Sequence, residues 1–369
     1  MRRVPRGQGA LDLAIAVLVV AFCAAWPALA RAESVASALD RPALMVNHPE
    51  RTTLLGAAQA GARLVAVGER GIVIVSDDAG ARWRQVPVPA SVTLTAVRFA
   101  DAMHGFAVGH GGVVLASADG GLTWARRLDG RQAAQLALDA ARADGDAKAI
   151  KQAERLVADG ADKPFLDLHF SDANHGIVVG AYNLAFTTAD GGSHWQSVMA
   201  RLDNPKALHL YALRARGEAL LIAGEQGLVL RSDDKGRSFR RLAVPYKGSF
   251  FTAELPSADG REMVVAGLRG NVWHSGDAGE SWAASVVPMP ASITGSALLP
   301  GRAGGSIPAT VFVNQAGQVL RGRGDAVTAS AGTPLPPLTG VLPLAGGDLL
   351  ILGVAGVSVQ AATETGAPK

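Results

Sequence analysis

Cysteine is nearly absent from this chain, which has one such residue, Cys23, among 369. Cys23 lies in an apolar run, 13–26, that follows a basic start and precedes the small-residue triplet Ala28-Leu29-Ala30. This order is typical of a cleaved signal peptide, which we expect to comprise residues 1–30. The mature chain would then have no disulfide in an oxidising compartment, so its stability must come from a hydrophobic core.

The apolar run is also short. It spans residues 13–26, about 14 residues, whereas a helix needs about 20 to cross a bilayer. An uncleaved anchor is therefore the less favoured alternative. Phe22, directly ahead of Cys23, is a poor match to the lipobox of a lipoprotein. We expect a periplasmic or otherwise exported protein that is soluble after cleavage.

An excess of charge of either sign is missing as well. The chain has 35 Lys and Arg against 32 Asp and Glu, and without the charges of the signal peptide 32 and 31 remain. A balance this close to neutral gives no electrostatic footprint for nucleic acid or for an anionic membrane surface. We therefore expect no nucleic-acid partner.

Catalytic motifs are the last notable absence. The eight histidines form neither H-E-x-x-H nor H-x-x-E-H, and neither a G-x-S-x-G elbow nor a phosphate-binding loop occurs. These absences favour a protein that is not an enzyme and uses neither a cofactor nor a metal.

What the chain does have is a repeat. The pattern S/T-x-D-x-G-x-x-aromatic, which we call the Asp box, occurs five times, at intervals of 41, 71, 44 and 43 residues. Two short glycine-bounded apolar strands precede each box, and the same strand pair recurs without a box in 310–320 and 349–359. Seven units of four strands, with a period of about 40 residues, predict an all-β, seven-bladed β-propeller over residues 31–369.

The Asp boxes are predicted to be structural. A short acidic or hydroxyl side chain can close a turn by bonding its backbone, and the glycine that follows tolerates positive φ. The aromatic residue is expected to pack between blades. Calcium binding is the alternative, but each carboxylate is used by its own turn and no box offers the several oxygens calcium requires. The carboxylates are Asp78, Asp119, Asp190, Asp234 and Asp277, and the aromatics are Trp83, Trp124, Trp195, Phe239 and Trp282.

The hairpins between the second and third strands are expected on the face opposite the boxes, around the mouth of the channel. Loops on a rigid scaffold are where binding residues concentrate. Two interpretations stay open for this ring of side chains: a partner-binding site, or solvated residues selected for hairpin geometry. The ring consists of Glu69, Arg70, His110, Tyr182, Asn183, Glu225, Gln226 and Arg269.

Residues 128–164 interrupt the repeat between the second and third units. Two runs rich in helix formers, 132–143 and 147–157, flank a break at Asp144-Gly145 and predict a helical hairpin. Because the insertion falls in a crossing between blades, we expect it on the same face as the ring. It either covers apolar loop surface or docks a partner.

The seventh unit ends near Val359 without a fourth strand. The extended segment Pro42 to Val46 is therefore predicted to complete the last blade.

The combination V-G-x-x-G-x-[VI]-x-x-S-x-D-x-G-x-x-W, clearest at Val67-Gly68-Glu69-Arg70-Gly71, resembles the photosystem II stability/assembly factor family. The resemblance extends from about Arg51 to Val287. It implies a seven-bladed propeller that binds membrane-protein intermediates and is not an enzyme. It also implies a surface arginine patch, to which Arg70 and Arg269 would correspond.

The helical insertion and the segments HGIVVGAYN and AGEQGLVLRSDD look more like a bacterial branch of that family found outside photosynthesis. The resemblance implies a monomeric binding scaffold, or assembly factor, for a membrane protein or envelope complex. This branch is associated with envelope transport systems, and no residue here points to a photosynthetic partner.

Asp boxes also occur in sialidases, so an exoglycosidase is an alternative. Such an enzyme needs an arginine cluster and a Tyr nucleophile with a Glu partner. The chain has three tyrosines, Tyr182, Tyr211 and Tyr246, of which Tyr246 is the best placed. A carbohydrate- or peptide-binding propeller is a further alternative.

Overall fold

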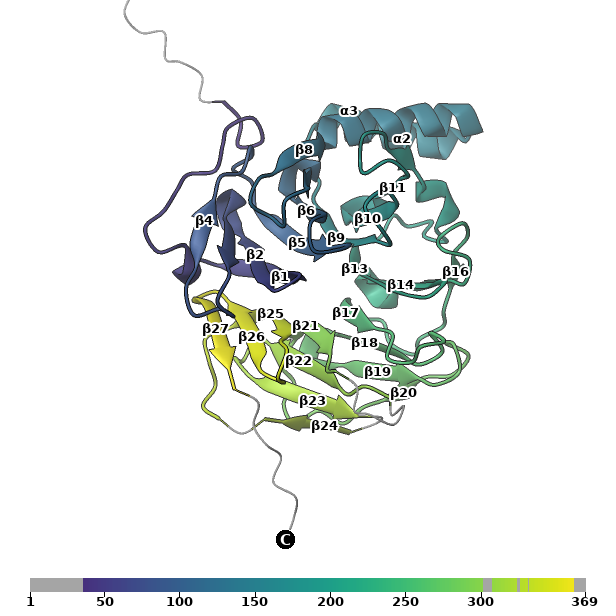
Figure 1. The fold of residues 1–369 in the computed structure, drawn as a ribbon. Coiled ribbons are helices and arrows are strands. Elements are labelled where there is room, and N and C mark those ends of the chain that lie inside the picture. Colours follow the sequence, from purple (N-terminus) through teal and green to yellow (C-terminus); the bar gives the residue numbers. More distant parts are fainter. Residues whose placement is uncertain (1–35, 301–306, 324–325, 331, 362–369) are drawn as a thin grey trace, which may run out of the picture. The chain divides into compact units, whose positions relative to one another are not determined.

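The computed structural model describes residues 36–300, 307–323, 326–330 and 332–361 (Figure 1). The expected signal peptide, 1–30, lies outside them. The chain divides into two units, Met1–Ser37 and Ala38–Lys369, and the helices and strands described below belong to the second.

The second unit is built from seven antiparallel sheets, each formed by consecutive strands. Blade 1 comprises β1 (Leu54–Ala60), β2 (Arg63–Gly68), β3 (Val73–Ser76) and β4 (Arg84–Val86); blade 2, β5 (Leu94–Phe99), β6 (Gly105–Gly109), β7 (Val114–Ser117) and β8 (Ala125–Leu128); blade 3, β9 (Phe165–Phe170), β10 (Gly176–Gly180), β11 (Ala185–Thr188) and β12 (Gln196–Ser197). Blade 4 comprises β13 (Leu210–Arg216), β14 (Ala219–Gly224), β15 (Val229–Ser232) and β16 (Arg240–Arg241); blade 5, β17 (Phe250–Glu254), β18 (Met263–Gly267), β19 (Val272–Ser275) and β20 (Ala283–Ala284). Blade 6 comprises β21 (Ile293–Leu298), β22 (Thr310–Asn314), β23 (Val319–Arg323) and β24 (Ala326–Ala329); blade 7, β25 (Leu338–Pro343), β26 (Leu349–Gly353) and β27 (Gly356–Gln360).

The first strand of every blade lies nearest the central axis, and the later strands lie progressively outward (Figure 1). The second and third strands are almost entirely apolar and buried, because both of their faces pack against neighbouring blades. The prediction of a seven-bladed all-β propeller is confirmed.

Each Asp box closes the turn between the third and fourth strands with side-chain hydrogen bonds. In blade 1 the Ser76 hydroxyl donates to Asp78 Oδ1 at 2.9 Å and accepts from the Gly80 amide at 2.9 Å. Asp78 Oδ1 also accepts from the Arg82 amide at 2.9 Å. The same pattern recurs in blades 2 to 5, so each carboxylate is engaged by its own turn, as predicted.

The aromatic of each box packs against the preceding blade. Trp124 of blade 2 shares a core with Val65 and Val75 of blade 1, and its Nε1 donates to the Gly121 carbonyl at 3.0 Å. Trp195 of blade 3 packs in the same way against blade 2. The boxes therefore join successive blades as well as closing their own turns.

The predicted helical hairpin is present. Helices α2 (Gly130–Asp144) and α3 (Ala147–Asp159) lie between blades 2 and 3. Asp129 caps α2 by accepting from the Gln132 amide, and the Gln132 side chain bonds back to the Asp129 amide, which forms a capping box. Ala133, Leu138 and other small or apolar residues of α2 are buried against blades 2 and 3.

The predicted role of Pro42 to Val46 is wrong. This segment runs beside the last strand of blade 1, not blade 7: the Ala43 amide bonds Val88 O at 2.9 Å and the Val46 amide bonds Gln85 Oε1 at 2.9 Å. Among the described residues blade 7 has three strands. The extended, proline-containing sequence is typical of an edge strand. Which blade such a strand pairs with depends on packing that the sequence does not reveal.

Two side chains anchor residues 38–46, which we call the strap. Leu39 is buried in the core shared by blades 1 and 2. Asp40 accepts from both terminal nitrogens of Arg131 at the start of α2, at 2.7 and 3.1 Å. The strap thus connects the outer edge of blade 1 to the helical hairpin.

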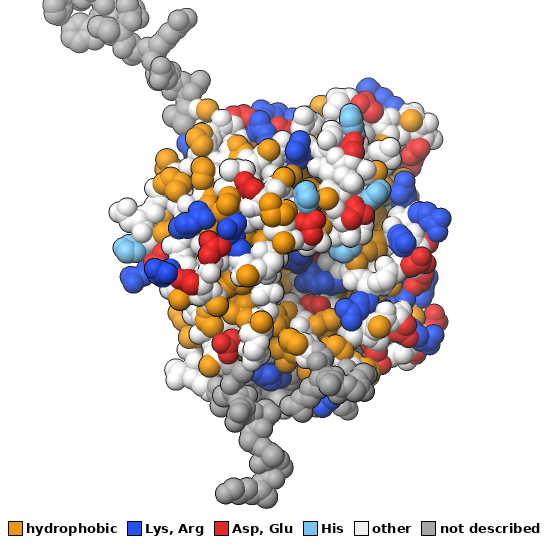
Figure 2. Space-filling view, in the orientation of Figure 1, with side chains coloured by type: hydrophobic (Ala, Val, Ile, Leu, Met, Phe, Trp, Pro, Cys, Tyr) orange, Lys and Arg blue, Asp and Glu red, His pale blue; other side chains and the backbone are white. Residues whose placement is uncertain are grey.

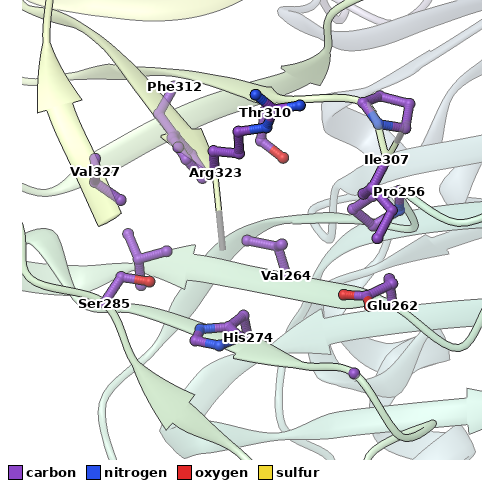
Figure 3. A pocket seen from close by; sticks show the side chains of 14 residues that line it. Pro256, Glu262, Val264, His274, Ser285, Ile307, Thr310, Phe312, Arg323 and Val327 are labelled. Carbon is purple, nitrogen blue, oxygen red and sulfur yellow. The ribbon is translucent and has the colours of Figure 1, made fainter. Parts of the chain in front are cut away.

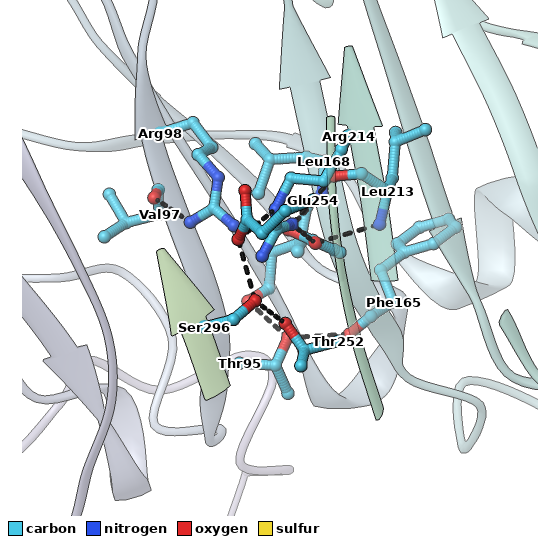
Figure 4. Close-up of polar contacts among 12 residues, drawn as sticks. Thr95, Val97, Arg98, Phe165, Leu168, Leu213, Arg214, Thr252, Glu254 and Ser296 are labelled. Atoms are coloured by element: carbon cyan, nitrogen blue, oxygen red, sulfur yellow. Dashed lines mark hydrogen bonds and ion pairs between the residues drawn. The ribbon is translucent and has the colours of Figure 1, made fainter. Parts of the chain in front are cut away.

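A polar cluster lies among the inner strands of blades 2 to 6 (Figure 4). Asp167 on β9 binds Arg98 on β5 at 3.0 Å and Arg214 on β13 at 2.6 Å, and it also accepts from two backbone amides. Arg214 reaches Glu254 on β17 at 3.3 Å, and Glu254 accepts from Ser296 on β21 at 2.8 Å. We call this the central ion network.

The charges of the central ion network compensate one another. Burial alone would raise the pKa of Asp167, but Arg98, Arg214 and two amides outweigh it and lower that pKa. Burial opposes the charge of Arg214, yet Glu254 and Asp167 raise its pKa. Burial, with nearby Arg98, lowers the pKa of His169. Two cations and two anions are therefore paired in the channel.

The strap generates the first prediction. Leu39→Ala removes a side chain that is 5% exposed and should lower the free energy of unfolding by about 2 kcal/mol or more. Leu44→Ala is the matched control, because Leu44 is 77% exposed, and its effect should be under about 0.5 kcal/mol. Urea denaturation measures both. Equal effects would show that the strap is not anchored through Leu39.

The Asp boxes generate a pH prediction. Hydrogen bonds from the residue four positions on hold the pKa of Asp78, Asp190 and Asp277 to about 2. The pKa of an aspartate in an unfolded chain is about 3.9. The boxes therefore stabilise the fold fully above about pH 4, and this contribution is lost as pH falls through about 2.

The melting temperature, followed by circular dichroism from pH 6 to pH 2, should fall across that window. The Asp277→Asn variant should have a lower melting temperature than wild type at pH 6. Its melting temperature should fall less steeply below pH 4, because the variant lacks one carboxylate with a lowered pKa. A melting temperature that stays constant down to pH 2 would contradict the assignment.

The central ion network generates a third prediction. Asp167→Asn leaves two half-buried guanidinium groups facing one carboxylate and should cost about 3 kcal/mol of stability. Glu154→Gln breaks the exposed pair with Arg142 (3.8 Å) and should cost less than about 1 kcal/mol. Denaturant unfolding of the two variants compares them directly, and similar losses would argue against a buried network.

Candidate binding face

Five equivalent three-residue turns join the second and third strands of blades 1 to 5. They are η3 (Glu69–Gly71), η4 (His110–Gly112), η5 (Ala181–Asn183), η7 (Glu225–Gly227) and η8 (Leu268–Gly270). The first amide of each turn bonds a carbonyl just ahead of the innermost strand of its blade, as Glu69 N does with Thr53 O at 3.1 Å. The turns therefore lie at the start of the inner strands, around the mouth of the channel.

The middle residue of each turn is left-handed. Arg70, Tyr182, Gln226 and Arg269 have φ between 53° and 57°, and only blade 2 has glycine, Gly111, at this position. A left-handed residue other than glycine costs about 1–2 kcal/mol. Four blades thus carry a side chain at a position where glycine would fit, as Ala79, Lys235 and Ala278 do in the Asp boxes.

The position in the turn decides where each predicted ring residue lies. The second position is exposed, so Arg70, Tyr182, Gln226 and Arg269 project from the surface, as does His110 from a first position. Glu69 and Glu225 are half-buried, and Glu225 accepts from the His209 amide at 3.2 Å.

Asn183 does not lie on the surface. Its third-position side chain is buried, donates to Met199 O at 3.2 Å and accepts from Asn204 Nδ2 at 2.9 Å. Asn183 therefore supports the turn and the crossing that follows blade 3, and the surface ring consists of the other seven residues.

An aromatic row, absent from the sequence-based ring, lies beside Tyr182. His209 contacts the Tyr182 ring edge-on at 4.7 Å between centroids, and the row continues through Tyr211 and Phe251 at 6.0 and 5.3 Å. Tyr211 and Phe251 are the second residues of β13 and β17, where each inner strand has a bulge. Lys163 Nζ lies 5.1 Å from the centre of the Tyr182 ring.

The helical hairpin stands on this same face. The backbone of turn η4 approaches the start of α2 so closely that a Cβ on Gly112 would collide with Gly130. Lys163, in the segment that returns from α3 to blade 3, reaches Tyr182. The predicted side of the insertion agrees with these contacts.

The Asp boxes lie at the other end of the strands. Their turns bond to the turns between first and second strands: Gly120 N donates to Met103 O at 2.9 Å and Gly191 N to Asn174 O at 3.0 Å. The boxes are therefore separated from the ring by the length of the blades.

Tyr246, the nucleophile candidate of the glycosidase alternative, is held in a packing role. Its hydroxyl donates to Leu268 O at 3.0 Å, and its ring packs on Phe250 and Trp273. Burial raises the pKa of Tyr246, with Arg269 opposing, and this disfavours the phenolate a nucleophile requires. Burial and Glu225 raise the pKa of Tyr211 as well.

Figure 2 shows one face of the molecule, which is hollowed near its centre, with basic and acidic side chains visible in the hollow. Within the part of the chain that the structure describes, no cluster of three or more potential ligands could hold a metal ion. The described helices include none long and apolar enough to cross a membrane.

Sequence reasoning missed the central ion network and the aromatic row. A signal for the first exists: Arg98, Asp167, Arg214 and Glu254 are charged residues within otherwise apolar strands. The aromatic row has a weaker signal, because Tyr211 and Phe251 are equivalent only once the bulges are known.

Comparison with known proteins gives consistent results. The family model described as photosynthesis system II assembly factor YCF48 matches residues 75–152 and 147–307. A photosystem II assembly lipoprotein Ycf48 from Synechococcus sp. (strain CC9902) is 34% identical over 82 residues. That match covers 22% of this chain and only 25% of the relative.

Solved structures show the same fold. YCF48 from Cyanidioschyzon merolae superposes with a TM-score of 0.62 at 14% identity, over 86% of this chain and 97% of that one. The WD40 propeller domain of Doa1 superposes with a TM-score of 0.59 at 11% identity, over 87% and 95%. These likenesses establish the propeller architecture.

A structure described as YCF48 bound to D1 peptide aligns with 53% of this chain and 62% of that one, at a TM-score of 0.43 and 20% identity, which is too partial to place a peptide here. The family match, in contrast, covers more than half of the chain and includes all five complete Asp boxes. The chain therefore belongs to the YCF48 family of photosystem II assembly factors.

Proposed function

We propose that this protein is a non-catalytic binding scaffold that assists the assembly or stability of a membrane protein complex. The observation that carries the proposal is the set of exposed side chains at the middle position of four equivalent turns. Arg70, Tyr182, Gln226 and Arg269 are displayed at one position of the turns around the channel mouth. Membership of an assembly-factor family supports the same role.

The chemistry of this face suits a protein partner. Tyr and Arg are the residues that most often dominate protein interfaces, and both occur at the exposed turn position. The aromatic row from Tyr182 to Phe251 adds apolar area between the exposed cations Arg70 and Arg269. A partner segment with both acidic and apolar side chains would complement it.

Binding without catalysis is supported by how the charged groups are used. Asp167 and Glu254, the buried carboxylates of the channel, are neutralised by Arg98 and Arg214. Tyr246 is tied to a carbonyl. The charged and phenolic groups considered for chemistry thus have structural partners.

The proposed partner is a membrane protein of the cell envelope, reached by export of this chain. The Synechococcus relative is described as an assembly lipoprotein, which supports an exported location. The resemblance to bacterial members outside photosynthesis supports an envelope transporter as the first class of partner to test. We propose that the mature protein is a soluble monomer.

The fourth prediction tests this face with glycine substitutions. Arg70→Gly/Arg269→Gly removes both side chains from turns that accept glycine, as Gly111 shows in blade 2. Stability should change by less than about 1 kcal/mol per site, because relief of the left-handed strain offsets the entropy of glycine. Capture of integral membrane proteins from detergent-solubilised envelopes should fall roughly tenfold or more, as measured by quantitative mass spectrometry.

Lys235→Gly is the matched control. Lys235 is also a left-handed, exposed cation, with φ of 60°, but it lies in the Asp box of blade 4 on the opposite face. This variant should capture the same membrane proteins as wild type. Identical capture by all three proteins would exclude the ring as the binding site.

A further inference from the structure

Blade 6 lacks an Asp box, and the strand register shows what replaces it. In the five blades with a box, the Ser or Thr is the last residue of the third strand and the aromatic directly precedes the fourth. In blade 5, His274 of β19 pairs with Ala283 of β20. The next residue toward the turn on each strand is Ser275 and Trp282, so these two lie opposite each other. In blade 6 the equivalent pair is Gly322 and Val327.

The loss of the box removes an aromatic side chain from the contact between blades 5 and 6. Each box aromatic packs against the preceding blade, so an aromatic at position 327 would lie against blade 5. The position of His274 in blade 5 is taken by Val75 in blade 1 and by Ala116 in blade 2. Val75 packs with Trp124 of blade 2, and Ala116 packs with Trp195 of blade 3. His274 faces a blade that offers valine instead.

A cavity of about 530 Å³ occupies this place (Figure 3). Val264 and His274 of blade 5 form one wall, and Phe312, Gly322 and Val327 of blade 6 form the other. Its volume lies within the range of about 300–1,000 Å³ typical of ligand sites. Glu262, Gly276 and Arg323 line it near the strand ends that carry the boxes, away from the ring of turns.

Two polar atoms in the cavity wall lack partners. His274 Nδ1 and Ser285 Oγ are buried and have no hydrogen-bond partner among the described residues. A buried polar atom left unpaired costs about 1–3 kcal/mol. The cavity therefore offers apolar walls together with two groups that a hydrogen-bonding ligand would satisfy.

We propose that this cavity is a receptor for an aromatic side chain with a hydrogen-bonding edge, tryptophan above all, presented by a partner polypeptide. The fold itself supplies the argument for this occupant. At four other blade junctions the same register position holds a box tryptophan, and the Nε1 of Trp83, Trp124 and Trp195 donates to a glycine carbonyl of its own box. A partner's tryptophan would fill the place that a box aromatic takes at the other junctions, and its indole N–H would donate to His274 Nδ1 once that ring rotates toward the cavity.

The experiment uses the purified protein with ¹³C-labelled valine methyl groups and N-acetyl-tryptophanamide as the probe. Titration should shift the methyl signals of Val264, Val272 and Val327, which line the cavity. The signals of Val65 and Val75, at a junction that Trp124 already fills, should not move. N-acetyl-alaninamide should shift none of them.

Substitution of the wall separates the cavity from adventitious binding. Val327→Trp places the protein's own aromatic at the box position and should abolish the shifts while the fold is retained. Val264→Phe narrows the other wall and gives the same test if Val327→Trp does not fold. His274→Phe removes the Nδ1 acceptor and should weaken binding roughly three- to tenfold.

A Trp-containing hexapeptide should compete with the free amide for the same methyl signals, as a side chain presented by a polypeptide would. Arg70→Gly/Arg269→Gly should bind the probe as wild type does, so this proposal and the binding-face proposal fail separately. The cavity proposal is overturned if the three valines do not shift, or if both wall variants bind the probe unchanged.

Discussion

The packing of each Asp-box aromatic onto the preceding blade is the interaction on which this propeller depends. The sequence has no cysteine beyond Cys23, and the described blades share no strands, so each junction is held by side-chain packing. The box carboxylate fixes the turn, the turn fixes the aromatic, and the aromatic closes the junction, as Asp119 and Trp124 show between blades 1 and 2. Local hydrogen bonding and long-range packing are thus coupled in one eight-residue motif.

This coupling explains how the ring closes although no strand is exchanged between its ends within residues 36–361 as far as the structure describes them. Trp83, the aromatic of the first box, packs in a core with Leu350 and Leu352 of blade 7. Closure therefore uses the same contact as the junctions inside the ring, and the strap is free to lie along blade 1 and anchor the helical hairpin through Asp40. The turns around the channel mouth add a second set of contacts between blades: the Tyr182 amide donates to His209 Nδ1 at 2.9 Å and the Arg269 amide to Ser292 Oγ at 3.2 Å.

Features that depend on local spacing were predictable from the sequence, and features that depend on which surfaces meet were not. The blade number, the boxes and the helices follow from a repeat and from helix-forming runs. The strap was assigned to the wrong blade because extended residues carry no mark of their partner. Asn183 was placed in the ring because hairpin residues look alike in sequence, whereas its third-position side chain turns inward to Asn204. The central ion network needed the inner strands of five blades to be brought together.

The junction between blades 5 and 6 shows how an interaction surface arises in such a fold. A repeat protein cannot easily add a pocket between well-packed blades, because each junction is filled by its own aromatic. Loss of one box removes that aromatic, while the rest of the junction stays packed through Val272, Phe312 and Leu320. The missing Asp box, which appears in the sequence as a break in the repeat, thus coincides with the cavity that we propose as a site for an aromatic side chain.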